Sequence, residues 1–149
     1  MYSFTGNTES KVDAKGRVSV PAAYRKQLAE KCETQLVARI EKYDNYSLLT
    51  VFPQSVWEEI LKGVQSKLNM HDKNDRFFFM NYTRLIFTLD IDCNGRVLIP
   101  KACQKQINLG DEVEISGCLD RFSIAPKDTV QYMDFEQLAD EEQDRFGNK

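Results

Sequence analysis

The sequence predicts an α+β protein made of two similar halves that pack on each other. Three observations support this prediction: a 17-residue segment occurs twice, alternating apolar strands follow each copy, and a stretch with helical apolar spacing lies between them. The chain has 149 residues, of which 42% are hydrophobic and 29% charged. These values are typical of a soluble globular protein, and the length suits one domain or two small halves packed as one.

The repeat is the most informative feature of the chain. Residues 12–28 read VDAKGRVSVPAAYRKQL and residues 91–107 read IDCNGRVLIPKACQKQI, at a constant offset of 79 positions without a gap. Eight of the 17 aligned positions are identical. Chance does not explain this agreement, so the chain contains two copies of one supersecondary unit.

Each copy begins with a turn of the form Asp-x-x-Gly-Arg. Gly16 and Gly95 provide the positive φ that a tight turn requires. Asp13 and Asp92 are placed to accept hydrogen bonds from backbone N–H groups within the turn. A strand with alternating apolar residues comes next, and a proline then ends the strand and suits the first position of a short helix.

Two further strands are expected after each unit. They cover residues 35–40 and 46–52 in the first half, and residues 112–115 and 121–124 in the second. A half with three or four short strands and one short helix is too small to bury its apolar face alone, so we expect the two halves to share one core.

The segment between the two repeats is predicted to be helical. Ser55 to Glu58 has the pattern of a capping box, after which Trp57 and Leu61 recur at helical spacing. A second helix is expected after Asp72 or Asn74, with its aromatic stripe, which includes Phe78 and Tyr82, packed inward.

The C-terminal part is expected to form a last helix over residues 127–142, with Val130, Met133 and Leu138 inward, before a solvated end. The predicted organisation has four segments: a first repeat at 7–54, a helical insert at 55–84, a second repeat at 85–128, and an acidic C-terminal helix and tail at 129–149.

The charge is unevenly distributed. The net charge of −3 argues against nucleic acid as a partner. However, residues 1–31 carry six basic and three acidic side chains, whereas residues 127–149 carry three basic and seven acidic ones. The body of the protein is therefore close to neutral. This pattern excludes a strongly basic monomeric DNA binder but not a multivalent one.

We expect no enzymatic activity, no cofactor and no metal site. The four cysteines lack zinc-ligand spacing, the single histidine lies far from them in sequence, and there is no P-loop, G-x-S-x-G or G-x-G-x-x-G motif. Asp90 and Asp92 lie on one side of a predicted strand, but the first copy has Lys11 in place of Asp90, so we expect Asp90 to face solvent. No apolar run approaches the roughly 20 residues of a membrane helix, and the N-terminus has no signal-peptide pattern, which predicts a cytoplasmic protein.

The chemistry that both copies share is an arginine, Arg17 in the first and Arg96 in the second. A planar, permanently charged guanidinium at a turn suits a phosphate or a guanine edge. Alternatively, each arginine pairs with the aspartate of its own turn and only fixes the turn, and the two interpretations are compatible. Lys15 is replaced by Asn94 in the second copy, which predicts a larger electrostatic contribution from the first turn.

The segments Asp13-x-Lys-Gly-Arg17-Val-Ser-Val-Pro21 and Asp92-x-x-Gly-Arg96-Val-Leu-Ile-Pro100 resemble the paired motifs of the MraZ family, over about residues 1–128. The resemblance implies two pseudo-symmetric swapped-hairpin β-barrel repeats of the SpoVT/AbrB type. It also implies a cytoplasmic, nucleoid-associated transcriptional regulator that forms a ring-shaped homo-oligomer. Such a protein binds double-stranded DNA at promoter direct repeats, upstream of the cell-division and cell-wall gene cluster that contains its own gene.

The predicted DNA-binding residues are Lys15, Arg17, Asn94 and Arg96, and the residues that orient them are Asp13, Gly16, Asp92 and Gly95. Neither a membrane nor a small-molecule substrate is expected as a partner. Two alternatives stay open: a protein-binding antitoxin or scaffold that uses the same fold without DNA, and a small enzyme with a site between the halves.

Overall fold

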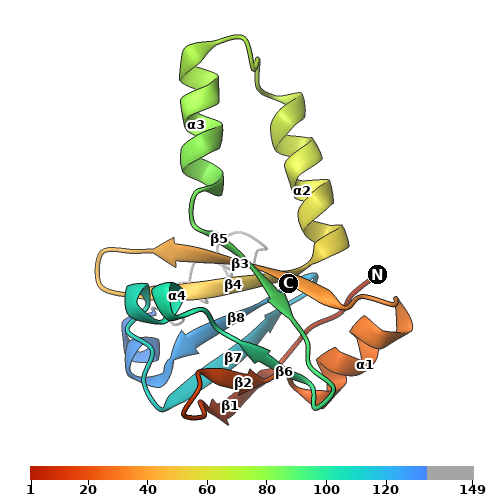
Figure 1. Ribbon diagram of the computed structural model, residues 1–149, viewed down its shortest axis with the longest axis vertical. Coiled ribbons are helices and arrows are strands. Elements are labelled where there is room, and N and C mark those ends of the chain that lie inside the picture. The colour runs from red at the N-terminus through yellow and green to blue at the C-terminus, as the bar shows by residue number, and fades with distance from the viewer. Residues whose placement is uncertain (134–149) are drawn as a thin grey trace, which may run out of the picture.

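The computed structural model describes residues 1–133, which form a sheet-based body and a projecting helical hairpin (Figure 1). The elements are β1 (Asn7–Lys11), β2 (Arg17–Ser19), α1 (Ala22–Glu30), β3 (Gln35–Lys42), β4 (Ser47–Pro53), α2 (Gln54–Ser66), α3 (Lys73–Thr83), β5 (Ile86–Asp90), β6 (Arg96–Leu98), α4 (Lys101–Gln106), β7 (Glu112–Cys118), β8 (Arg121–Pro126) and the 3-10 helix η1 (Lys127–Tyr132). The predicted α+β class is confirmed.

The two halves exchange strands. The larger sheet has six antiparallel strands in the order β1-β7-β8-β4-β3-β5, and β2 pairs with β6 in a second, two-stranded sheet. The first strand of each half thus pairs with the other half, because β1 lies on β7 and β5 lies on β3. This pairing makes the protein pseudo-symmetric, as expected for swapped hairpins.

In each half, an isolated β-bridge joins the residue before the turn to the ribbon formed by β2 and β6. Val12 bridges Val18 in the first half, and Ile91 bridges Val97 at the equivalent place in the second half. The strands within residues 1–133 therefore form two linked sheets, and their continuous ladders do not close into one barrel.

One core serves both halves. Phe4 and Phe122 are fully buried, with their rings edge to face and their centroids 5.4 Å apart. Tyr24 of α1 packs on both rings, and its hydroxyl donates a hydrogen bond to the carbonyl of Thr5 at 2.8 Å. The N-terminal segment, the first helix and the last strand are thereby fixed to each other.

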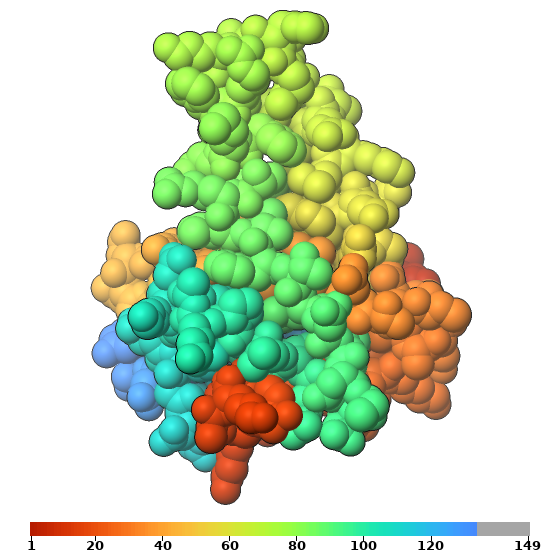
Figure 2. Space-filling model, in the orientation of Figure 1, coloured from red at the N-terminus to blue at the C-terminus, as the bar shows by residue number. Residues whose placement is uncertain are grey.

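The helices α2 and α3 form a hairpin that stands off the sheet, as Figure 2 also shows. Trp57 anchors its base, where it is buried against Phe52 and Val37. The prediction of a capping box at Ser55 is wrong: α2 begins at Gln54 directly after Pro53, and Ser55 lies inside the helix with its hydroxyl bonded to Glu33. Proline takes the position before the first turn, so no side-chain cap forms.

The second helix of the hairpin agrees with the prediction at its start and differs along its face. Asp72 caps α3 by accepting a hydrogen bond from the backbone N–H of Asp75 at 3.0 Å. Of the aromatic stripe, Tyr82 stacks on Trp57, but Phe78 is 54% exposed. Phe78 stacks on Tyr82 of the same helix but is not buried as expected, because α3 extends beyond the sheet and only α2 lies beside it (Figure 1).

The predicted last helix is only partly described. Residues Lys127–Tyr132 form a 3-10 helix rather than an α-helix, with Val130 and Met133 half-buried. Residues 134–142 of that predicted helix, including Leu138, lie outside the described residues, as does the rest of the acidic tail.

Gly117 of β7 and Gly63 of α2 offer a matched test of the packing. A methyl group at Gly117 would overlap the backbone of Phe4 and Thr5, whereas a methyl group at Gly63 meets no neighbouring atom. We expect Gly117→Ala to lower the free energy of unfolding by about 1–3 kcal/mol. Gly63→Ala should raise it by about 0.5–1 kcal/mol, because alanine favours the helix. Urea unfolding measures both, and equal effects would contradict the described approach of β7 to the N-terminal segment.

Candidate nucleic-acid interface

The pairing of β2 with β6 brings the two predicted turns together. In this ribbon Val18 lies opposite Val97, and both valines are buried in the core. Because side chains alternate along a strand, the neighbouring Arg17 and Arg96 lie on the outer face. The first turn (red) accordingly meets green segments of the second half at the surface in Figure 2.

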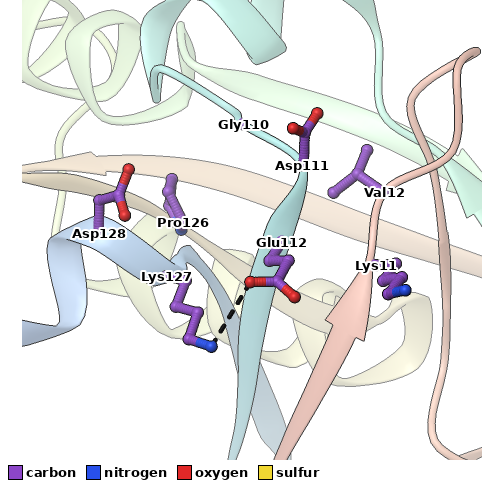
Figure 3. Close-up of a pocket in the computed structure, with 8 residues that line it drawn as sticks. All are labelled: Lys11, Val12, Gly110, Asp111, Glu112, Pro126, Lys127 and Asp128. Carbon is purple, nitrogen blue, oxygen red and sulfur yellow. Dashed lines mark ion pairs between the residues drawn. The ribbon is translucent and has the colours of Figure 1, made fainter.

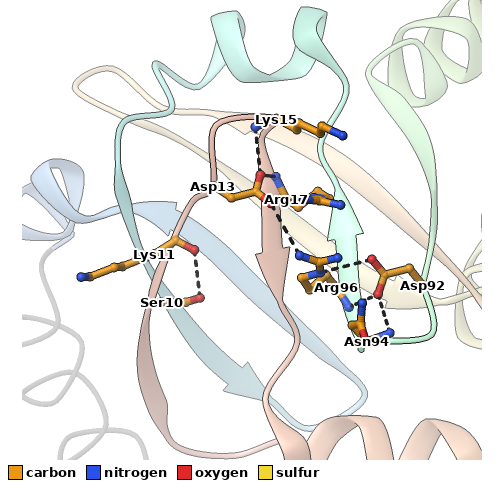
Figure 4. Close-up of polar contacts among 8 residues, drawn as sticks. All are labelled: Ser10, Lys11, Asp13, Lys15, Arg17, Asp92, Asn94 and Arg96. Atoms are coloured by element: carbon orange, nitrogen blue, oxygen red, sulfur yellow. Dashed lines mark hydrogen bonds and ion pairs between the residues drawn. The ribbon is translucent and has the colours of Figure 1, made fainter.

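The first turn is organised around one carboxylate (Figure 4). The Oδ1 atom of Asp13 accepts hydrogen bonds from the backbone N–H groups of Lys15 at 3.0 Å and Arg17 at 2.8 Å. The Oδ2 atom accepts the Nε–H of Arg17 at 2.6 Å. Gly16 has a φ of +87°, which explains the requirement for glycine.

The second turn repeats this arrangement. The Oδ1 atom of Asp92 accepts the backbone N–H groups of Asn94 and Arg96, both at 2.9 Å. The Nε atom of Arg96 lies 3.3 Å from Oδ2, and Gly95 has a φ of +75°. Both aspartates therefore accept backbone hydrogen bonds within their turns, and each arginine is oriented by the aspartate of its own turn.

These hydrogen bonds favour the ionised carboxylates. The pKa of Asp13 is lowered, with the backbone N–H of Arg17 as the largest cause. The pKa of Asp92 is lowered in the same way, with the backbone N–H of Arg96 as the largest cause. The two aspartates are thus ionised at neutral pH, and their oxygens are engaged by the turn.

Asp13 also reaches across to the second half, which the sequence does not indicate. Its Oδ2 atom lies 3.8 Å from Nη1 of Arg96, in addition to its contact with Arg17. The two arginines, called here the arginine pair, therefore form one cluster around Asp13 (Figure 4). The only signal in the sequence that relates them is the repeat itself.

The arginine pair is partly held and partly accessible. The side chains of Arg17 and Arg96 are 30% and 29% exposed, so they lie along the ribbon rather than project freely into solvent. Their contacts with the aspartates use the two Nε atoms and one Nη1 atom, and each guanidinium has five N–H donors. Some N–H donors of each guanidinium group therefore remain available to a binding partner. Lys15 and Asn94 are exposed beside the pair.

A helix from the opposite half covers each turn glycine. Gly16 and Gly95 are both buried, the first under the side chain of Gln104 in α4 and the second under the side chain of Arg25 in α1. Arg25 and Gln104 occupy equivalent positions in the two copies, since they differ by the repeat offset. The sequence does not indicate which turn each of these residues covers, because each approaches the turn of the other copy.

A hollow of about 550 Å³ lies where β1 ends and β7 begins, and Lys11 and Val12, which directly precede the first turn, line it (Figure 3). Two of the charged groups that line it form an ion pair, because the Nζ atom of Lys127 lies 3.4 Å from Glu112, and the same atom lies 3.6 Å from Glu9. The two carboxylates raise the pKa of Lys127, Glu112 being the larger cause. This hollow has mixed charge, and the arginine pair does not line it.

Residues 1–133 contain neither a membrane-spanning helix nor a metal-binding cluster. In this part of the chain no helix is both long and apolar enough to cross a membrane. Over the same residues, no three His, Cys, Asp or Glu side chains are grouped so as to hold a metal ion.

Comparison with known proteins identifies the family. The family described as "MraZ protein, putative antitoxin-like" matches residues 3–80, which is more than half of the chain. The chain belongs to the MraZ family. The matched region includes the whole first repeat and most of the helical hairpin.

Curated MraZ proteins are similar over nearly the whole chain. The protein is 34% identical to the transcriptional regulator MraZ of Bacteroides thetaiotaomicron, over 88% of this chain and 83% of that one. It is 32% identical to the transcriptional regulator MraZ of Bacteroides fragilis, over 93% and 87% of the two chains. For the transcriptional regulator MraZ of Christiangramia forsetii the identity is 31%, over 99% and 90%.

The lowered pKa values of the two turn aspartates predict an acid-dependent loss of stability in this MraZ protein. A carboxylate whose pKa is lower in the folded state stabilises that state above its unfolded pKa, and the stabilisation is lost as the pH falls through the folded value. We expect the urea concentration at the midpoint of unfolding to decrease as the pH is lowered below about 4. This decrease should be less steep in the double variant Asp13→Asn/Asp92→Asn. The control is Asp44→Asn in the exposed loop between β3 and β4. A double variant whose pH profile matches the control would contradict the assignment.

Proposed function

We propose that this MraZ protein is a sequence-specific, double-stranded DNA-binding transcriptional regulator that contacts DNA through its paired turns. The observation that carries the proposal is the juxtaposition of Arg17 and Arg96 on one outer face, each oriented by the carboxylate of its own turn. Lys15 and Asn94 complete this surface as a charged and a hydrogen-bonding group. The curated relatives are named transcriptional regulators, which supports the same function.

Guanidinium groups that are held in place lose less conformational entropy when they bind than freely rotating ones. An oriented arginine pair therefore suits bidentate contacts to phosphate oxygens or to a guanine edge. The proposed role is binding and not catalysis, and we propose no cofactor.

A near-neutral protomer has little long-range attraction for DNA, so we also propose that several copies of this chain assemble. Several copies in a ring-shaped homo-oligomer would bind successive direct repeats at once, and the tethered copies would raise the overall affinity. Phe77, Phe78 and Met80 on α3 are exposed apolar side chains that are available for contacts between copies. The proposed DNA target is the promoter of the protein's own cell-division and cell-wall gene cluster, and the proposed location is the cytoplasmic nucleoid.

Protein binding is the second candidate function. It is favoured by the "antitoxin-like" description of the family and by the exposed aromatic face of α3. Footprinting on the DNA upstream of the protein's own gene, together with a size measurement of the free protein, separates the two. A protected series of direct repeats and a defined oligomer support DNA binding. No protection, with a co-purifying protein partner, supports the antitoxin or scaffold function.

Removal of either arginine should weaken DNA binding. We expect Arg17→Ala and Arg96→Ala each to reduce the affinity for that upstream duplex by about tenfold or more. The slope of log K against log salt should also become shallower by about one for each phosphate that is no longer neutralised. Titration of a labelled duplex at several salt concentrations measures both. Lys42→Ala, an exposed charge at the far end of β3, is the control. If both arginine variants bind like this control, the proposed contact is wrong.

A further inference from the structure

The side chain of Arg25 lies over the second turn, although it belongs to the helix of the first half. It approaches Gly95 so closely that a methyl group there would overlap it. Both residues line a hollow of about 250 Å³ between α1 and the turn, and Asp92, Cys93 and Glu33 are among the other residues that line it. Arg25 therefore lies beside the turn that contains Asn94 and Arg96, and not beside the turn of its own half.

The equivalent residue of the second half is held differently. Gln104 lies over Gly16, and its Nε2 atom donates a hydrogen bond to the carbonyl of Ile99 at 2.6 Å. Arg25 is exposed, and within residues 1–133 it makes neither an ion pair nor a side-chain hydrogen bond. The guanidinium of Arg25 thus lies beside the second turn, and none of its N–H donors is bound to a side chain or carbonyl of residues 1–133.

Arg25 and Gln104 differ in charge in the opposite sense to Lys15 and Asn94. The first turn has Lys15 and the neutral Gln104, whereas the second has the neutral Asn94 and the charged Arg25. Each turn then has one cation besides its own member of the arginine pair. The sequence alone suggests a weaker second turn, because it does not reveal which helix covers which turn.

We propose that Arg25 contacts the DNA backbone beside the second turn and supplies the positive charge that Asn94 lacks. This inference rests on the proposed DNA-binding function and assigns to α1 a role in it. A charged side chain next to a phosphate adds affinity with little dependence on base sequence.

The test compares Arg25→Gln with Lys26→Gln, which removes the same charge from the next exposed residue of the same helix. We expect Arg25→Gln to reduce the affinity for the upstream duplex by about tenfold and to make the salt slope shallower by about one. Arg25→Lys should keep the slope, since it keeps the charge. Circular dichroism melting verifies that each variant is folded, and equal effects of Arg25→Gln and Lys26→Gln overturn the proposal.

A double-mutant comparison locates the contact. If Arg25 acts at the second turn, Arg25→Gln costs less affinity in an Arg96→Ala background than in a Lys15→Ala background. The same reduction in both backgrounds overturns the assignment to the second turn. Normal binding by Arg25→Gln while Arg17→Ala binds weakly refutes only this inference. Unchanged binding by Arg17→Ala, Arg96→Ala and Arg25→Gln refutes the proposed function as well.

Discussion

The structure depends on the antiparallel pairing of β2 with β6 across the two halves. Each of these strands has only three residues, and the register places Val18 opposite Val97 on the buried face of the ribbon. Two further hydrogen bonds extend the pairing into the turns, from the N–H of Val20 to the carbonyl of Gly95 and from the N–H of Ile99 to the carbonyl of Gly16. Neither half can form this ribbon alone. The pairing of β2 with β6 places the two turns side by side. It agrees with the shared core and with the exchange of β1 and β5 between the halves.

The ribbon also explains how a protein with an acidic average charge can present a basic site. The carboxylates next to the arginine pair accept hydrogen bonds within the turns, so they fix the geometry of Arg17 and Arg96. Two further cations, Lys15 and Arg25, belong to the first half, and Arg25 lies beside the second turn because α1 covers the turn of the other copy. Local placement therefore matters more than net charge, and repetition in an assembly would multiply a modest attraction.

Much of this arrangement could be predicted from sequence because it is local. The turn glycines, the aspartates that accept backbone hydrogen bonds, the helix-starting prolines and the Asp72 cap involve residues within a few positions of each other. The contact of Asp13 with Arg96 and the cover of Gly95 by Arg25 could not be predicted, because the repeat does not say which copy a side chain approaches. The predicted cap at Ser55 failed because Pro53 starts α2 earlier, and Phe78 is exposed because the sheet does not extend beneath α3.

We propose that the two turns form one DNA-contacting surface rather than two separate ones. The most direct measurement is a double-mutant cycle for DNA binding with Arg17→Ala, Arg96→Ala and the combined variant, at fixed salt concentration. Because both guanidinium groups lie around the carboxylate of Asp13, we expect a coupling energy of about 1 kcal/mol or more between the two substitutions. Reductions in binding free energy that simply add, within about 0.3–0.5 kcal/mol, would contradict a single surface.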